Sequence, residues 1–135
     1  MQAIEQEIQT KGKTAPRITP ADVDASITSE HYFTAAQAVS GGDTMADAAH
    51  PLNLLTFCVL VLRNGFTVSG ESACASPENF DAEIGQKIAR ENAVRKVWPL
   101  LGYALRTELS RPVLSDADAA ADLAGTPRPS SQAAG

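Results

Sequence analysis

Hydrophobic residues are concentrated in one short stretch near the middle of the chain. From Thr56 to Leu62 the sequence TFCVLVL is apolar or β-branched at every position, and the pair Asn64-Gly65 follows it. A run of this kind followed by Asn-Gly predicts a β-strand that enters a hairpin, which we place at about residues 55–71. The incoming strand is apolar on both faces, whereas the outgoing strand is half polar.

The expected turn also sets the expected strand pairing. A two-residue type I′ turn at Asn64-Gly65 would place Leu62 opposite Thr67 and Val61 opposite Val68. One face would then carry an apolar set, namely Phe57, Val59, Val61 and Val68. Because an isolated two-stranded sheet is marginally stable in water, we expect several copies of the chain to associate and cover the hairpin.

Helical signals lie on both sides of the hairpin. Thr19-Pro20 combines an N-cap residue with a proline suited to the first turn, so a helix is expected to begin there. The segment SEHYFTAAQAV (29–39) is expected to extend that helix or to open a second one. The segment SGGDTMADAAHP (40–51) has the composition of a loop.

A second, longer helix is expected over about 77–98. It begins at Ser76-Pro77 by the same device as the first helix, and Pro99 is expected to end or kink it, with LLGYALRTEL (100–109) forming a short closing helix. Steps of 100° per residue gather small residues on one side, so that side is expected to pack closely against the sheet or another helix. The stripe consists of Ala82, Gly85, Ala89 and Ala93, with Ile84 and Ile88 expected near it on the same side.

The ends of the chain lack strong structural signals. Residues 1–17 are interpreted as a flexible N-terminal arm, with a short frayed helix over the first ten residues as the alternative. Residues 113–135, poor in large apolar side chains, are interpreted as a disordered C-terminal tail. One α+β domain is therefore expected over 18–112, with an N-terminal helix or helix pair, one antiparallel hairpin, a long helix and a short closing helix.

Charge and composition narrow the classes of partner. The 135-residue chain has a net charge of −5 and a pI near 4.9, which disfavours broad binding to nucleic acid or to anionic membranes. No apolar run is long enough to cross a bilayer, and no secretory signal is recognisable at the start. The two cysteines, Cys58 and Cys74, are expected to be reduced thiols.

No catalytic, cofactor-binding or metal-binding motif is present in the sequence. The stretch GESACAS around Cys74 is not a nucleophile elbow, and the two histidines do not have a metal-ligand spacing with the cysteines. We therefore expect no enzyme activity, no cofactor and no bound metal.

The candidate ligand-binding residues are cations and rings. Lys87, Arg90 and Arg95 follow one another along the predicted long helix, where the simpler interpretation is a solvated face joined by i,i+4 ion pairs such as Glu83 with Lys87. His31, close to Glu30, is a candidate general base, and Tyr32 is a candidate for stacking on a nucleobase, although a packing role is the more common one for both. Arg63 stands beside the hairpin turn, where it is equally well placed to cover Phe66.

The order of three segments identifies a resemblance. ITSEHYFTAA, LTFCVLVLRNGFTVSGESACASPENFD and the helix AEIGQKIARENAVRKVWPLLGY resemble a family of small tailed-phage proteins first known from N4-like coliphages and a Shigella podovirus, and found also in prophages. The resemblance covers about residues 18–105. It implies a protein made by a phage or prophage in the cytoplasm of a host bacterium, and it supplies no catalytic residues.

Two functions fit that context. The favoured expectation is an anti-defence protein that sequesters a small anionic nucleotide as a homo-oligomer, with His31, Tyr32, Arg63, Lys87, Arg90 and Arg95 in the binding pockets. The alternative is an inhibitor of a host protein that acts through protein–protein contacts. Nucleic-acid binding is the least favoured class, although basic residues near Arg95 and Lys96 keep it open.

Overall fold

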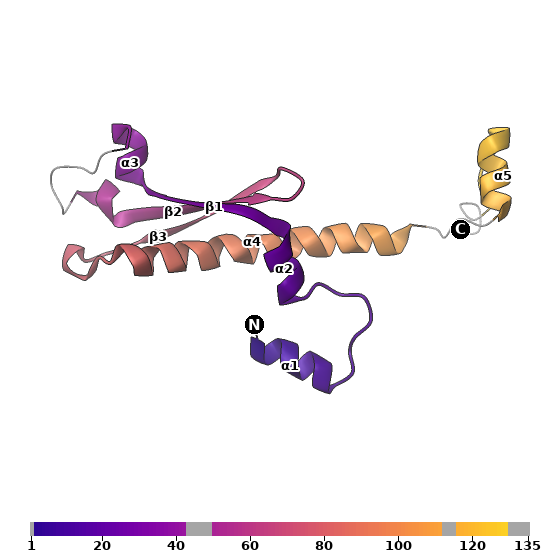
Figure 1. Cartoon of the computed structure of the whole chain (residues 1–135), viewed down its shortest axis with the longest axis horizontal. Helices are drawn as coiled ribbons and strands as arrows, with labels where there is room; N and C mark the ends of the chain where they lie inside the picture. The colour runs from indigo at the N-terminus through magenta and orange to yellow at the C-terminus, as the bar shows by residue number, and fades with distance from the viewer. Residues whose placement is uncertain (1, 43–49, 112–115, 130–135) are drawn as a thin grey trace. The chain divides into compact units, whose positions relative to one another are not determined.

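A computed structural model describes residues 2–42, 50–111 and 116–129 of the chain (Figure 1). It divides into two compact units, residues 1–103 and 104–135. The described residues form five α-helices, two short 3-10 helices and one three-stranded antiparallel sheet, so the predicted α+β class is confirmed.

The predicted hairpin is present, and it contributes two of the three strands. β2 (Leu55–Leu62) is the central strand and β3 (Thr67–Ala73) is one edge. The other edge is β1 (Ile27–Thr34), which pairs antiparallel with β2 along nearly its whole length. The apolar strand β2 is therefore paired on both sides within a single copy of the chain.

The prediction of a helix across residues 29–39 was wrong for the first half of that segment. Residues up to Thr34 are in β1, and a helix, α3 (Ala35–Ser40), begins only afterwards. The Thr34 side chain accepts the N–H of Gln37 and the Gln37 side chain accepts the N–H of Thr34, a capping box that fixes the change from strand to helix. The aromatic and β-branched residues of β1 favour a strand once β2 offers a free edge to pair with.

The predicted hairpin register was wrong by one residue. Leu60 pairs with Val68, and the N–H of Leu62 donates to the carbonyl of Phe66 at 2.8 Å, so three residues form the connection. Gly65 has a φ of +87°, whereas Asn64 does not adopt the positive φ that a type I′ turn requires. Because side chains alternate along a strand, this shift moves Val68 to the face of Leu60.

The predicted helix start at Thr19-Pro20 is confirmed. α2 (Pro20–Ser26) begins with a complete capping box, in which the Thr19 hydroxyl accepts the N–H of Asp22 and the Asp22 carboxylate accepts the N–H of Thr19. Val23, in the middle of this helix, is almost fully buried in the core.

One long helix covers one face of the sheet. α4 (Ala82–Ser110) begins after Asp81, whose side chain accepts the N–H of Ile84 at 3.1 Å. The Ser76-Pro77 signal instead starts a 3-10 helix, η2 (Pro77–Asn79). The prediction of a separate closing helix was wrong, because α4 continues through Pro99. The proline lacks an N–H and so removes one hydrogen bond of the helix without ending it.

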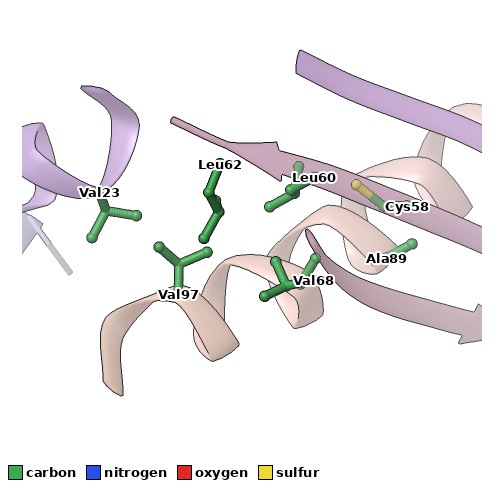
Figure 2. Packing of buried hydrophobic residues seen from close by; sticks show 8 residues of the cluster. Val23, Cys58, Leu60, Leu62, Val68, Ala89 and Val97 are labelled. Atoms are coloured by element: carbon green, nitrogen blue, oxygen red, sulfur yellow. The ribbon is translucent and has the colours of Figure 1, made fainter. Parts of the chain in front are cut away.

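Three of the four residues of the predicted stripe face the sheet, whereas Ala82 is exposed, as are Ile84 and Ile88, which were expected on the same side. Gly85, Ala89 and Ala93 are buried, together with Val97 one turn further on. Figure 2 shows that side chains from α2, β2, β3 and α4 meet in one apolar core. The buried core residues are Val23, Cys58, Leu60, Leu62, Val68, Ala89, Ala93 and Val97.

Both end segments, interpreted as a flexible arm and a disordered tail, contain a helix, which had been an alternative only for the first ten residues. α1 (Gln2–Thr10) lies within the predicted N-terminal arm, where Glu5 and Arg17 form an ion pair of 2.6 Å. α5 (Asp116–Ala124) lies within the predicted C-terminal tail, where alanines favour a helix and acidic residues occupy its first turn. A 3-10 helix, η1 (Pro51–Leu54), precedes β2, and most of the predicted loop 40–51 lies outside the described residues.

Candidate functional site

Two polar side chains of β1 and one of α4 form a connected cluster at the β1 edge of the sheet. Glu30 of β1 accepts a hydrogen bond from Arg90 of α4 at 2.8 Å (Nε to Oε1) and another from the hydroxyl of Tyr32 at 3.0 Å (to Oε2). Glu30 and Tyr32 are two residues apart on the same face of β1, and Arg90 follows the buried Ala89 on the helix. Strand pairing and helix packing therefore bring together residues 60 positions apart.

The electrostatics of this cluster favour the charged forms of Glu30 and Arg90. Partial burial raises the pKa of Glu30, but the hydrogen bonds from Arg90 and Tyr32 outweigh that effect, so the net direction is down. The same hydrogen bond from Arg90 to Glu30 raises the pKa of Arg90. Burial, with a hydrogen bond to the Glu30 carboxylate, raises the pKa of Tyr32 to about 12.

A surface hollow of about 640 Å³ borders the cluster. Charged residues of both signs and small polar residues line it, together with one aliphatic residue; they are Asp24, Ile27, Thr28, Ser29, Glu30 and Arg90. Two carboxylates and one guanidinium line it, and the guanidinium is already bonded to one of the carboxylates. The hollow is therefore suited to a neutral or zwitterionic hydrogen-bonding group better than to a free phosphate.

The remaining candidate ligand residues lie elsewhere. His31 is on the opposite face of β1 from Tyr32, and its Nε2 lies 3.0 Å from the Ser29 hydroxyl oxygen. Arg63 follows β2, where its side chain donates to the carbonyl of Ala25 at 2.5 Å. Its backbone N–H donates to the carbonyl of Ser26, so Arg63 fastens the hairpin to the end of α2.

The cations of α4 are also separated. Lys87 forms an exposed i,i+4 ion pair with Glu83 at 3.2 Å, as the simpler interpretation of this helix predicted. Arg95 donates to the side chain of Asn92 at 3.2 Å. Of the six candidate residues, one copy of the chain thus brings only Tyr32 and Arg90 into one cluster, through Glu30.

The sequence did not indicate Glu30 as the residue that joins this cluster. Its neighbours in the sequence suggested a helix, in which Glu30 and Tyr32 would point in different directions. In a strand they share a face.

The face of the sheet opposite α4 carries a row of apolar side chains. β2 alternates between buried residues toward α4 and partly exposed residues on the other side, and Phe33 of β1 stacks on Phe57 of β2 with ring centroids 5.4 Å apart. We call the set Phe33, Leu55, Phe57, Val59 and Val61 the open face. In Figure 1, α4 runs along one side of the sheet, and among the described residues α3 packs at one end of the strands.

Other kinds of site find no support in the part of the chain that the structure describes. Within residues 2–42, 50–111 and 116–129, no group of three or more His, Cys, Asp or Glu side chains is placed to hold a metal ion. Cys58 and Cys74 are free thiols, and burial raises the pKa of Cys58. None of the helices among these residues combines the length and apolar character needed to cross a membrane.

Comparison with known proteins gives one match. The family described as Phage protein (N4 Gp49/phage Sf6 gene 66) matches residues 18–109, which is more than half of the chain and includes all three strands. No curated protein and no solved structure matches this chain. The match confirms the resemblance carried by the hairpin and the long helix, and this chain belongs to the Phage protein (N4 Gp49/phage Sf6 gene 66) family.

Proposed function

We propose that this phage protein is a non-enzymatic accessory factor that acts in the cytoplasm of the host bacterium by binding and inhibiting a host protein. The observation that carries the proposal is the open face. Its central row on β2 is apolar at every second position, and each of these side chains is left partly exposed. A rigid sheet that presents apolar and aromatic groups to solvent provides the apolar centre that protein interfaces need.

The surroundings of the open face fit such an interface. Polar and charged side chains flank the apolar row on the same face, among them His31 on β1 and Ser69 and Glu71 on β3. An apolar centre with a polar rim is the usual arrangement at a protein–protein contact. The function would be anti-defence if the bound protein belongs to a host defence system.

A charge placed at the centre of the open face tests the proposal. Val59→Lys would keep an aliphatic stem on the sheet and add an ammonium group to the proposed interface. Ile84→Lys is the matched control, because Ile84 is 56% exposed on α4, which covers the other face. Thermal melts of both variants would verify that they fold.

The measurement is quantitative capture from a host lysate, followed by direct binding with the purified partner. A host protein retained by the natural chain and by Ile84→Lys, lost with Val59→Lys, and bound with fixed stoichiometry after purification is the expected result. If every captured protein binds equally well to Val59→Lys, the open face is not the binding surface.

Nucleotide sequestration is a second candidate function, favoured by the position of Arg90. Arg90 lines the hollow together with Thr28 and Ser29, and Tyr32 is hydrogen-bonded to the same carboxylate as Arg90. Because the other candidate cations are dispersed in one copy, a nucleotide site would have to draw them from several copies, and the phosphate would have to displace Glu30 from Arg90.

A nucleotide panel distinguishes this candidate from the first. Cyclic and linear nucleotides that bind the folded chain would raise its melting temperature, and Arg90→Gln would abolish the increase. No increase with any nucleotide would remove this second candidate and leave the first unaffected.

A further inference from the structure

The two edges of the sheet differ in how their backbone groups are used. Along β3, α4 supplies donors to the outward carbonyls. Lys96 Nζ lies 2.5 Å from the carbonyl oxygen of Ser69, and Asn92 Nδ2 lies 2.8 Å from that of Glu71. Side chains of the helix therefore occupy two outward carbonyls of this edge, which disfavours the addition of another strand.

The hydrogen bonds of β2 determine which backbone N–H and C=O groups of β1 point toward β2 and which point outward. Leu62 N–H donates to Phe66 of the hairpin, and Leu54 accepts from Cys74 beyond β3, so the even-numbered residues of β2 bond toward β3. The odd-numbered residues consequently bond toward β1, where their partners are Ser29, His31 and Phe33.

This alternation leaves the backbone groups of two β1 residues pointing away from the sheet. They are Glu30 and Tyr32, the residues between those that bond to β2. Within the described ranges, no hydrogen bond joins their backbone groups to another segment. The next outward N–H, that of Thr34, is already taken by Gln37 at 2.9 Å.

We propose that this edge binds the same edge of a second copy of the chain, forming an antiparallel β1–β1 pair centred on His31. In this register, Glu30 of each copy lies opposite Tyr32 of the other. Each such pair exchanges both of its backbone hydrogen bonds, so the four outward groups of Glu30 and Tyr32 in each copy are satisfied. A two-fold axis perpendicular to the sheet would relate the copies.

Charge and hydrogen-bond availability select this register over its neighbours. Centring the pair on Glu30 would oppose two carboxylates, which is unfavourable directly across strands. Centring it on Tyr32 would use Thr34, whose N–H is committed to the cap of α3. The register centred on His31 has neither cost, and it opposes a carboxylate with a phenol.

The proposal goes beyond host-protein binding, because it concerns the edge of the sheet and not the open face. In the pair, both copies of α4 would lie on the same side of a continuous six-stranded sheet, and the two open faces would adjoin on the other side. Self-association and host capture can therefore be measured separately.

Two variants with matched controls test the contact by sedimentation equilibrium from low to high micromolar concentration. Glu30→Pro and Glu30→Ala both remove the ion pair with Arg90, but only the proline removes the outward N–H, and proline is tolerated on an edge strand. His31→Lys would place two ammonium groups opposite each other, whereas Ser69→Lys adds the same charge to the same face on β3.

We expect the natural chain, Glu30→Ala and Ser69→Lys to form dimers. Glu30→Pro and His31→Lys should raise the dimer dissociation constant by roughly tenfold or more, through lost hydrogen bonds and like-charge repulsion. A natural chain that stays monomeric throughout the range, or dimers unaffected by both variants, would overturn the proposal.

Disulfide formation tests the register itself. In a Cys74→Ser background, His31→Cys would place two thiols at directly opposed, non-hydrogen-bonded positions, where Cβ atoms approach closely enough to form a bond under mild oxidation. Ser69→Cys on β3 should not cross-link. Equal cross-linking at both positions, or none at residue 31, would exclude a pair centred on His31.

Discussion

Gly70 of β3 lies directly against the backbone of Ala93 in α4. A Cβ atom added to Gly70 would clash with the Ala93 nitrogen and the Ala89 carbonyl oxygen, and would lie 2.8 Å from the carbonyl carbon of Asn92. Strand and helix backbones meet here without an intervening side chain. This contact explains why the sheet-facing side of α4 is built from Gly and Ala.

Gly70→Ala is therefore expected to destabilise the protein strongly. The atoms that would clash belong to the backbone of α4 and cannot move without shifting the helix, so we expect a loss of about 3 kcal/mol or more in the free energy of unfolding. Urea denaturation followed by circular dichroism would measure it.

Gly102→Ala provides the control for this prediction. Gly102 is in the same helix, and a Cβ there would have no atom within 4 Å. Alanine has the higher helix propensity, so this variant should be neutral or more stable by about 0.5–1 kcal/mol. Equal losses for both variants would show that Gly70 is not a point of close approach.

The titration of Tyr32 should report its contact with Glu30. The pKa of Tyr32 is raised from 10.0 to about 12, so its neutral form is favoured by folding. This contribution to stability is complete below pH 10 and is lost as the pH rises from 10 to about 12. In a Tyr103→Phe variant, ultraviolet absorbance would follow the ionisation of Tyr32 alone.

Removing the carboxylate separates the two causes of this shift. In Glu30→Gln the hydrogen bond to a negative charge is lost, so the midpoint for Tyr32 should fall but stay above its ordinary value, because burial is the larger cause. An unchanged midpoint would mean that Tyr32 does not contact Glu30 in solution.

Thr56 should tolerate the loss of its hydroxyl. The side chain is 3% exposed beneath α4, and its Oγ1 has no hydrogen-bond partner among the described residues. Thr56→Val keeps the shape and removes a buried, unsatisfied polar group, so we expect a gain of about 1 kcal/mol in the free energy of unfolding. Thr56→Ser, which keeps the hydroxyl and loses a methyl group, should be destabilising by about 1 kcal/mol. A loss of stability in the valine variant would imply that the hydroxyl is hydrogen-bonded in solution.

The cover on the β3 edge should be measurable as protection from aggregation. Asn92→Ala and Lys96→Ala together would expose the carbonyls of Glu71 and Ser69, because both side chains donate to this edge. We expect a cost of about 1 kcal/mol for each lost bond and a higher rate of aggregation on mild heating. Lys87→Ala, at an exposed ion pair on the same helix, is the control and should change neither the free energy of unfolding nor the rate of aggregation.

The elements that carry strong local signals could be predicted from the sequence. The hairpin was indicated by the apolar run and Asn64-Gly65, and the first helix by the chemistry of Thr19-Pro20. The sheet-facing side of α4 followed from the spacing of its small residues. In each case the decisive residues lie close together in the sequence.

Features that depend on distant partners could not be predicted in the same way. β1 is a strand because β2 offers it an edge, and nothing within residues 27–34 reveals that edge. The hairpin register depended on whether Asn64 adopts a positive φ, and the sequence Asn64-Gly65 is compatible with both a two-residue and a three-residue connection.

The candidate site was the least predictable part of the molecule. Arg90 and Tyr32 were recognised as candidates, but the carboxylate that joins them becomes a neighbour only after β1 forms and α4 packs across the sheet. The dispersal of Arg63, Lys87 and Arg95 likewise follows from the tertiary arrangement.

The cover that α4 places on β3 also limits how far assembly through β1 can proceed. A sheet doubled through β1 would begin and end with β3, and both of these outer strands already have donors for their carbonyls from Asn92 and Lys96. Growth would therefore stop after one addition, giving a self-limiting pair in place of a polymer.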